Sequence, residues 1–71
     1  MSTAPWPQHT LQNCRGQTVA VSPSLAFAPA HASLPVLTVD EMRRAMHPGW
    51  CVMQKDDGMS PAFVLYQGEP S

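Results

Sequence analysis

The residues best suited to chemistry are two histidines and two cysteines, which fall into two pairs. Four residues separate His9 from Cys14, and three separate His47 from Cys51. Two imidazoles and two thiolates are a ligand set that zinc binds tetrahedrally. Structural zinc sites, however, use close Cys-x2-4-Cys pairs, and this sequence has none. We therefore predict no metal or other cofactor, and the four residues remain candidate ligands of a metal-stapled structural module.

A disulfide between Cys14 and Cys51 is the other staple that the sequence offers. It would close a loop of more than thirty residues and would stabilise the fold by about 3–4 kcal/mol. No export signal is apparent, and disulfides are rare in reducing compartments. Free thiols are therefore favoured, while the bridged and metal-bound forms stay open as alternatives.

Patterns typical of catalysis are missing from the sequence. It contains neither a Gly-rich phosphate loop nor a G-x-S-x-G turn. The turn 56–58, Asp-Asp-Gly, lacks the alternating acidic ligands and the closing Glu of a calcium loop. Asp40 and Glu41 are neighbours on a predicted helix, where adjacent side chains diverge by about 100°. We expect a protein that is not an enzyme, and infer no small-molecule substrate.

The charge of the chain argues against nucleic acid as its main partner. Charged residues make up 13% of the sequence and the net charge is −1, whereas phosphate binding rests on clustered Lys and Arg. Only Arg43 and Arg44 are adjacent basic residues. Beside Trp50, Phe63 and Tyr66 they could form a base-stacking platform. A small transcriptional or post-transcriptional regulator that binds nucleic acid is therefore the alternative function.

Nothing in the sequence indicates contact with a membrane. No stretch approaches the ~20 apolar residues of a membrane span. The Ala-rich run at 24–32 lacks the basic segment of a signal peptide, and Pro29 interrupts it. These observations predict a cytoplasmic protein.

The elements that would position these residues are clearest in the second half of the chain. Thr38 and Glu41 have the spacing of a capping box, which predicts a helix over about 38–47. Apolar residues recur there at helical spacing, and Pro48-Gly49 ends the pattern. The apolar face of this helix consists of Val39, Met42, Ala45 and Met46.

Strands are predicted on both sides of that helix. Asp57-Gly58 between two apolar segments predicts a β-hairpin with strands at about 50–54 and 61–66. Alternating side chains predict a short strand at 17–22, followed by an Ala/Pro/Ser-rich loop at 23–36. The expected fold is a small single α+β domain, with the helix packed on an antiparallel sheet.

The domain is expected to span residues 17–67. Residues 1–16 have no periodicity and two prolines around Trp6, so we predict an extended N-terminal arm, with flexibility as one interpretation. Residues 68–71 are expected to form a tail. In the other interpretation of the arm, Trp6 docks on a partner, because Trp is enriched at interface hot spots.

These features favour a function in protein–protein contact. Both hairpin strands are apolar on both faces, which is more than one short helix covers, so the Ala/Pro/Ser-rich loop or another chain must supply the rest. We therefore predict a small accessory protein that is an inhibitor, adaptor or assembly component, with another protein or a second copy as partner. Its size and layout are similar to those of small proteins encoded by phages and other mobile elements. The candidate contact residues are Trp6, Arg43, Arg44, His47, Trp50 and Tyr66.

Overall fold

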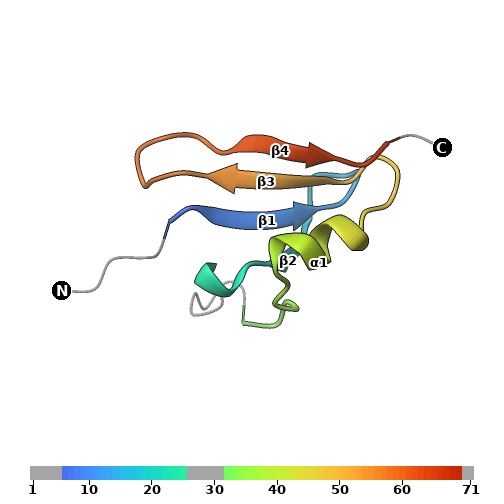
Figure 1. Cartoon of the computed structure of the whole chain (residues 1–71), viewed down its shortest axis with the longest axis horizontal. Helices are drawn as coiled ribbons and strands as arrows, with labels where there is room; N and C mark the ends of the chain where they lie inside the picture. The colour runs from blue at the N-terminus through green and yellow to red at the C-terminus, as the bar shows by residue number, and fades with distance from the viewer. Residues whose placement is uncertain (1–5, 26–31, 70–71) are drawn as a thin grey trace.

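The computed structural model describes residues 6–25 and 32–69, which form a four-stranded antiparallel sheet and one short α-helix. The strands lie side by side in the order β2-β1-β3-β4 (Figure 1). This is the small α+β domain with a C-terminal hairpin that the sequence predicts. In chain order the elements are β1 (Gln8–Gln12), β2 (Thr18–Val21), the 3-10 turn η1 (Pro23–Leu25), α1 (Val39–Arg44), β3 (Cys51–Lys55) and β4 (Phe63–Gln67).

The strand β1 differs from the expectation of a separate N-terminal arm. Its backbone is extended, as predicted, but it is a central strand that pairs with β2 on one side and β3 on the other. Leu11, its one apolar residue, is 2% exposed. The other four residues of β1 are polar, so the strand shows no alternation of apolar residues. Its pairing with β2 and β3, rather than its composition, therefore determines β1.

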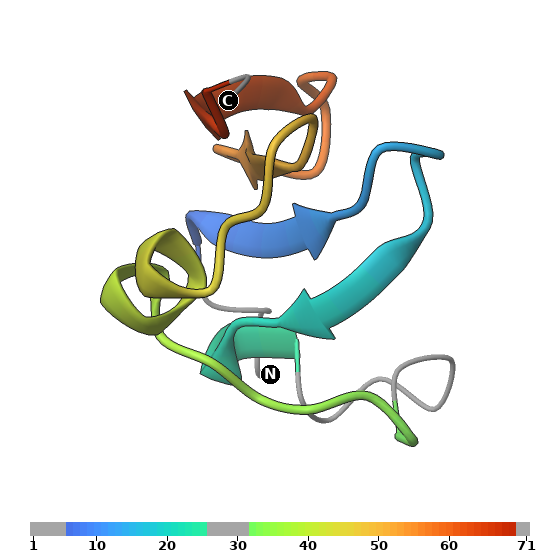
Figure 2. The same ribbon diagram turned by 90° about the vertical axis from the view of Figure 1, so that its right-hand side faces the viewer.

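The core lies between the sheet and α1. Ala20, Leu11 and Val52 are consecutive partners across β2, β1 and β3, so their side chains share one face of the sheet. Met42 of α1 packs on them, and all four residues are buried. Figure 2 shows α1 on one side of the sheet. Ala45 and Met46 also pack against this cluster, which confirms three residues of the predicted apolar face; beside them lies Leu37, which precedes the helix, and not the predicted Val39.

The helix begins where the sequence predicts and ends earlier. The Glu41 amide donates to the Thr38 hydroxyl (3.2 Å), and the Thr38 amide donates to the Glu41 carboxylate (3.0 Å), which confirms the capping box. At the other end, the amide of Ala45 is shared between two carbonyl groups, and that of Met46 reaches only the carbonyl three residues back. Pro48 disfavours helical geometry at His47, so the last predicted turn does not continue the α-helix.

The two edges of the sheet are finished differently. Residues 35–37, called the strap below, run beside β2: the Val21 amide donates to the Pro35 carbonyl (3.1 Å), and the Leu37 amide donates to the Val21 carbonyl (2.9 Å). The strap belongs to the predicted loop 23–36 and the residue after it. At the opposite edge, no described segment pairs with the outer side of β4. One edge of the sheet is therefore covered at Val21, and the other has no described neighbour.

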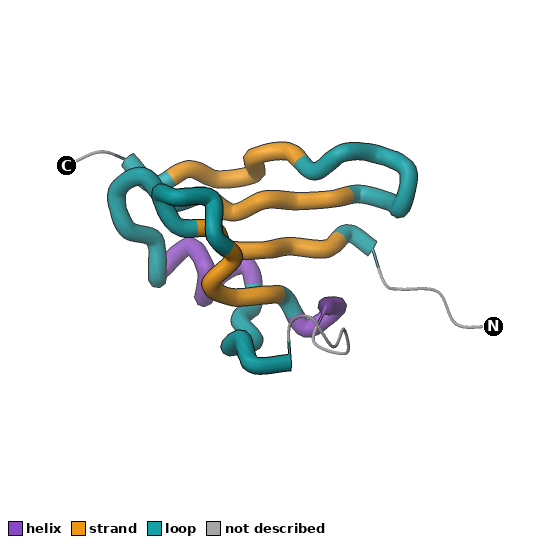
Figure 3. Tube along the Cα trace, turned by 180° about the vertical axis from the view of Figure 1, so that it is seen from behind, coloured by secondary structure: helices purple, strands orange, loops and turns teal. Residues whose placement is uncertain are grey.

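The hairpin of β3 and β4 extends beyond the helix. In Figure 1 its loop lies at the end of the sheet opposite to α1. Seen from behind, β1, β3 and β4 lie in front of α1, and neither described helix crosses this rear face (Figure 3). Within residues 6–25 and 32–69, no helix is long and apolar enough to cross a membrane.

Candidate binding surface

The open edge strand β4 carries the largest group of exposed apolar side chains in the described structure. Phe63 is 42% exposed, Val64 is 51% exposed and Tyr66 is 36% exposed. We call these three residues, with the outer backbone of β4, the β4 surface. None of the five residues of β4 is charged. The surface thus combines unpaired backbone groups with apolar side chains.

The exposure of β4 follows from the short reach of the helix. Tyr66 is the partner of Val52, so it continues the row of side chains that contains Leu11 and Ala20. Burial is almost complete along that row until it reaches Tyr66. The six residues of α1 cover only the strands nearest to it, and β4 lies beyond them.

A shift in pairing divides β4 into two halves. Met53 is the partner of Val64 and Val52 is the partner of Tyr66, which leaves Leu65 without a Cα partner on β3. Such a β-bulge bends a strand and increases its twist. Residues on either side of Leu65 keep their pairing with β3, and both halves present their other side to solvent.

The loop before β4 is held by an aspartate. The Asp57 carboxylate accepts hydrogen bonds from the amides of Ser60 (2.6 Å) and Met59 (2.8 Å). These amides lower the pKa of Asp57 below its usual value, and the charge of Lys55 contributes in the same direction. The residue therefore stays ionised at neutral pH and fixes the turn that delivers the chain into β4. The sequence predicts this turn at Asp57-Gly58.

The end of β4 is anchored by a backbone contact. The Gly68 amide donates to the Trp50 carbonyl oxygen at 2.7 Å. A Cβ atom at Gly68 would overlap the carbonyl oxygen of His47, so only glycine permits this approach. Gly49, with φ of +85°, makes the turn that places those carbonyl groups. Residues 47–50 therefore hold the end of β4, although the sequence predicts only a tail from residue 68.

Four of the predicted contact residues form two pairs at the end of the sheet near α1. The Arg43 guanidinium lies over the Tyr66 ring, with Cζ 4.4 Å from the ring centroid. The His47 and Trp50 rings meet edge to face with centroids 4.5 Å apart. Trp50 is half-buried and packs on the core, so its ring has a structural role. Of these four, Tyr66 is part of the β4 surface, and Arg43 lies over its ring.

The other two predicted contact residues lie apart from those pairs. Arg44 lines a shallow hollow of about 440 Å³ with Arg43 and Asp40. Trp6 lies beside the hairpin loop, because a Cβ at Gly58 would be 3.7 Å from Trp6 Cζ2. The six residues therefore do not make one continuous site.

Two of the candidate metal ligands, His9 and Cys51, lie on opposite faces of the sheet. His9 Nε2 lies 2.9 Å from Gln54 Oε1. Its side chain and that of Cys51 are on opposite faces of the sheet, because His9 and Gln12, the partner of Cys51, are three positions apart on β1. Cys14 and Cys51 are free thiols. In the part of the chain that the structure describes, no three His, Cys, Asp or Glu residues gather closely enough to hold a metal ion.

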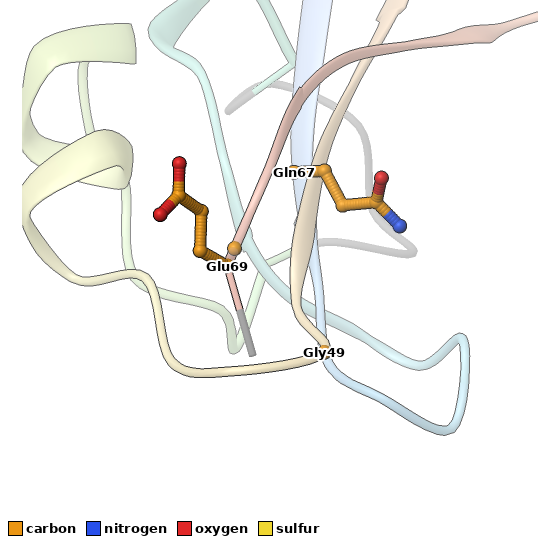
Figure 4. Close-up of a pocket in the computed structure, with 4 residues that line it drawn as sticks. Gly49, Gln67 and Glu69 are labelled. Atoms are coloured by element: carbon orange, nitrogen blue, oxygen red, sulfur yellow. The ribbon is translucent and has the colours of Figure 1, made fainter. Parts of the chain in front are cut away.

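Two further hollows lie beside the end of β4. Gly49, Gln67, Gly68 and Glu69 line one of about 350 Å³. Figure 4 shows the Gln67 amide and the Glu69 carboxylate pointing to opposite sides of the chain. Another, of about 230 Å³, lies between Arg43 and Glu69 and includes the side of Tyr66. Both depressions are open to solvent.

The contact residues predicted from the sequence do not include Phe63 and Val64, which the structure exposes. Their apolar character is typical of core residues, and only the edge position of β4 makes them accessible. The signal was the apolar character of both faces of the predicted hairpin, which exceeds what one helix covers. Met59, 95% exposed in the hairpin loop, is a further accessible apolar residue of this region.

Comparison with protein families, curated proteins and solved structures gives no match to this chain.

Proposed function

We propose that this chain is a small non-enzymatic protein that acts by binding another protein chain through the β4 surface, as an inhibitor, an adaptor or an assembly component. One observation carries the proposal: an uncharged edge strand exposes Phe63, Val64 and Tyr66 beside unpaired backbone groups. Proteins usually protect such an edge with charge, proline or a covering segment, because it is a template for pairing with another strand.

Two kinds of contact contribute to binding at a sheet edge. Backbone hydrogen bonds to an added strand supply affinity, and side chains on alternate positions supply specificity. Here Arg43 lies over the Tyr66 ring and holds it in place, so part of the surface is ordered before a partner arrives. The hollow between Arg43 and Glu69 gives a neighbouring place for a partner side chain.

The charges around the arginines favour a protein partner over nucleic acid. Arg43 and Arg44 share one hollow with Asp40, and Arg43 shares another with Glu69. Each arginine therefore has a carboxylate nearby, whereas binding of nucleic acid requires a surface with clustered positive charge. We place the protein in the cytoplasm, which the two free thiols support, and the small size suits an accessory protein of a phage or mobile element.

The test compares three forms of the chain as bait in affinity purification from the source cells. Val64→Lys puts a charge in the middle of the β4 surface, and Val64→Thr is the matched control, because it keeps a β-branched, uncharged residue. We expect the same protein to be recovered by the unmodified chain and by Val64→Thr. Val64→Lys should recover about tenfold less, since a desolvated charge at an interface costs at least 1.4 kcal/mol.

Folding of each bait is checked by circular dichroism and thermal unfolding. Equal recovery by all three folded forms would contradict the role of the β4 surface.

A further inference from the structure

The two cysteines lie at the same end of neighbouring strands. Cys51 is the first residue of β3 and the Cα partner of Gln12, the last residue of β1. Cys14 follows two residues later, in the turn between β1 and β2. Each step forward along β1 is matched by one step back along β3, so this register places Gly49 opposite Cys14. The contact is present, since a Cβ atom at Gly49 would lie 3.1 Å from Cys14 Cβ.

This continued register makes Cys14 and Cys51 diagonal neighbours. Gln12 and Cys51 are partners, so their side chains share one face of the sheet. Cys14 is two positions beyond Gln12, and it contacts Gly49, which is two positions before Cys51. Because Gly49 has no side chain, nothing at that position stands between the two thiols. Cys14 is exposed and Cys51 is half-buried, so a reagent in solution reaches Cys14 more easily.

The geometry of diagonal neighbours sets the cost of joining the two sulfur atoms. Diagonal residues of an antiparallel pair have Cα atoms about 7–8 Å apart, whereas disulfides usually join Cα atoms about 4.4–6.8 Å apart. A bridge therefore needs the turn at 13–17 to move toward β3 by on the order of 1 Å. Such a disulfide carries strain and is reduced more readily than a relaxed one, so its formation is reversible.

We propose that Cys14 and Cys51 form a reversible intramolecular disulfide, which gives the chain a redox-sensitive link between the β1–β2 turn and the start of β3. The link is open in the free-thiol form of the structure. It closes when a low-molecular-weight disulfide such as oxidised glutathione is in excess, and it opens again when reduced glutathione is in excess. The inference is independent of the proposed function of the β4 surface.

The link forms in two exchange steps. The exposed Cys14 thiolate attacks one sulfur atom of the oxidant, whose S–S bond breaks; one thiol leaves, and a mixed disulfide remains on Cys14. The Cys51 thiolate then attacks Cys14 Sγ, which forms the Cys14–Cys51 bond and releases the second thiol. Each cysteine gives up one proton, which the released thiolates take up. Two electrons pass from the cysteines to the oxidant, which is reduced to two thiols.

The bridge reaches the segment that holds the end of β4. Residues 47–50 end directly before Cys51, and the Trp50 carbonyl oxygen accepts a hydrogen bond from the Gly68 amide. A bond from Cys51 to the β1–β2 turn restricts the movement of this segment. Local opening of the Gly68 hydrogen bond should therefore be rarer in the oxidised chain.

Equilibration of the chain in mixtures of oxidised and reduced glutathione tests the link. After alkylation of free thiols, trypsin releases Cys14 in peptide 1–15 and Cys51 in peptide 45–55, so mass spectrometry detects the bridge as these two peptides joined. We expect the equilibrium constant for bridge formation to be at least about tenfold larger in buffer than in concentrated urea, because the fold raises the effective concentration of one thiol near the other.

Cys14→Ser and Cys51→Ser are the matched controls, because each keeps one thiol and cannot form the link. In the unmodified chain, the Gly68 amide should exchange with deuterium at least about threefold more slowly after oxidation. The same treatment should leave this exchange rate unchanged in both serine variants.

Three results would overturn the inference. One is glutathione bound to both cysteines without the joined peptides. Another is a bridge that forms equally well in buffer and in urea, since the fold would then contribute nothing. The third is a disulfide between two chains in place of the Cys14–Cys51 bond.

Discussion

β2 and β4 both lie at an edge of the sheet, yet only β2 has a neighbour on its outer side. Val21 of β2 exchanges backbone hydrogen bonds with the strap and is completely buried. Val64 of β4 has a similar apolar side chain and remains about half exposed. Without the strap, β2 would have unpaired amide and carbonyl groups on its outer side, as β4 has. The difference in burial shows that side chains pack closely at the β2 edge, while those of β4 remain accessible.

The strongest test of this contrast removes a side chain from each region. Leu11→Ala deletes a core residue under α1 and should lower the free energy of unfolding by about 2–5 kcal/mol. Val64→Ala on the open edge should lower it by less than about 1 kcal/mol. Urea unfolding followed by circular dichroism measures both. Similar losses at the two positions would show that β4 is as well packed as the core; Leu11→Val serves if the alanine variant does not fold.

The next largest loss of stability is expected at Gly68, whose amide holds the end of β4. An alanine at Gly68 must push its Cβ away from the His47 carbonyl oxygen, and it disturbs the hydrogen bond to Trp50. We expect a loss of about 2–3 kcal/mol in the free energy of unfolding. Gly58→Ala is the matched control, because its Cβ has ordinary contact with Trp6 and should cost less than about 1 kcal/mol. Thermal unfolding of both variants separates the outcomes.

A further variant weakens the pairing of the strap with β2, so that the β2 edge becomes more like the β4 edge. Leu37→Pro removes the amide that donates to Val21, and leaving a buried carbonyl unpaired costs about 1–3 kcal/mol. Urea unfolding should therefore show a loss of that size in the free energy of unfolding. Leu37→Met keeps the amide and should behave as the unmodified chain. A Leu37→Pro protein as stable as the unmodified chain would show that the strap does not stabilise the β2 edge.

The smallest expected effect concerns the cap that follows the strap. Thr38→Ala should cost about 1 kcal/mol, because it removes the hydroxyl that accepts from the Glu41 amide. In the unmodified chain the Thr38 backbone amide, followed by its hydroxyl, lowers the pKa of Glu41, with a smaller contribution from Arg44. The variant should therefore raise this pKa toward the usual glutamate value, which a carboxyl-detected NMR titration measures.

The same lowered pKa gives the sign of the pH dependence. Since the folded pKa of Glu41 lies below the unfolded one, the stabilisation is complete above the unfolded value of ~4.3 and is lost as pH falls through the folded pKa. Asp57 acts in the same sense. Unfolding midpoints should therefore fall below about pH 4, and less so in Thr38→Ala. A midpoint that rises on acidification would contradict both assignments.

Local interactions explain which parts of the fold the sequence predicts. The Thr38–Glu41 capping box, the aspartate turn of the hairpin and both of its strands depend on residues close together in the chain, and each is present in the structure. β1 was missed because its one apolar residue, Leu11, carries no periodic signal. Of the candidate contact residues, Arg43 and Tyr66 meet only because α1 lies across the end of the hairpin.

The sequence by itself determined the caps, the turns and the apolar strands, since these depend on backbone geometry and side chains within a few residues. The tertiary structure decided which strands are central and which edge is open. Pairing of β1 with β3 joins residues 39 to 47 positions apart, and the strap reaches β2 only after the chain has folded back. The accessibility of Phe63 and Val64 follows from that arrangement, because a short helix at one end of a four-stranded sheet leaves the strand farthest from the covered edge exposed.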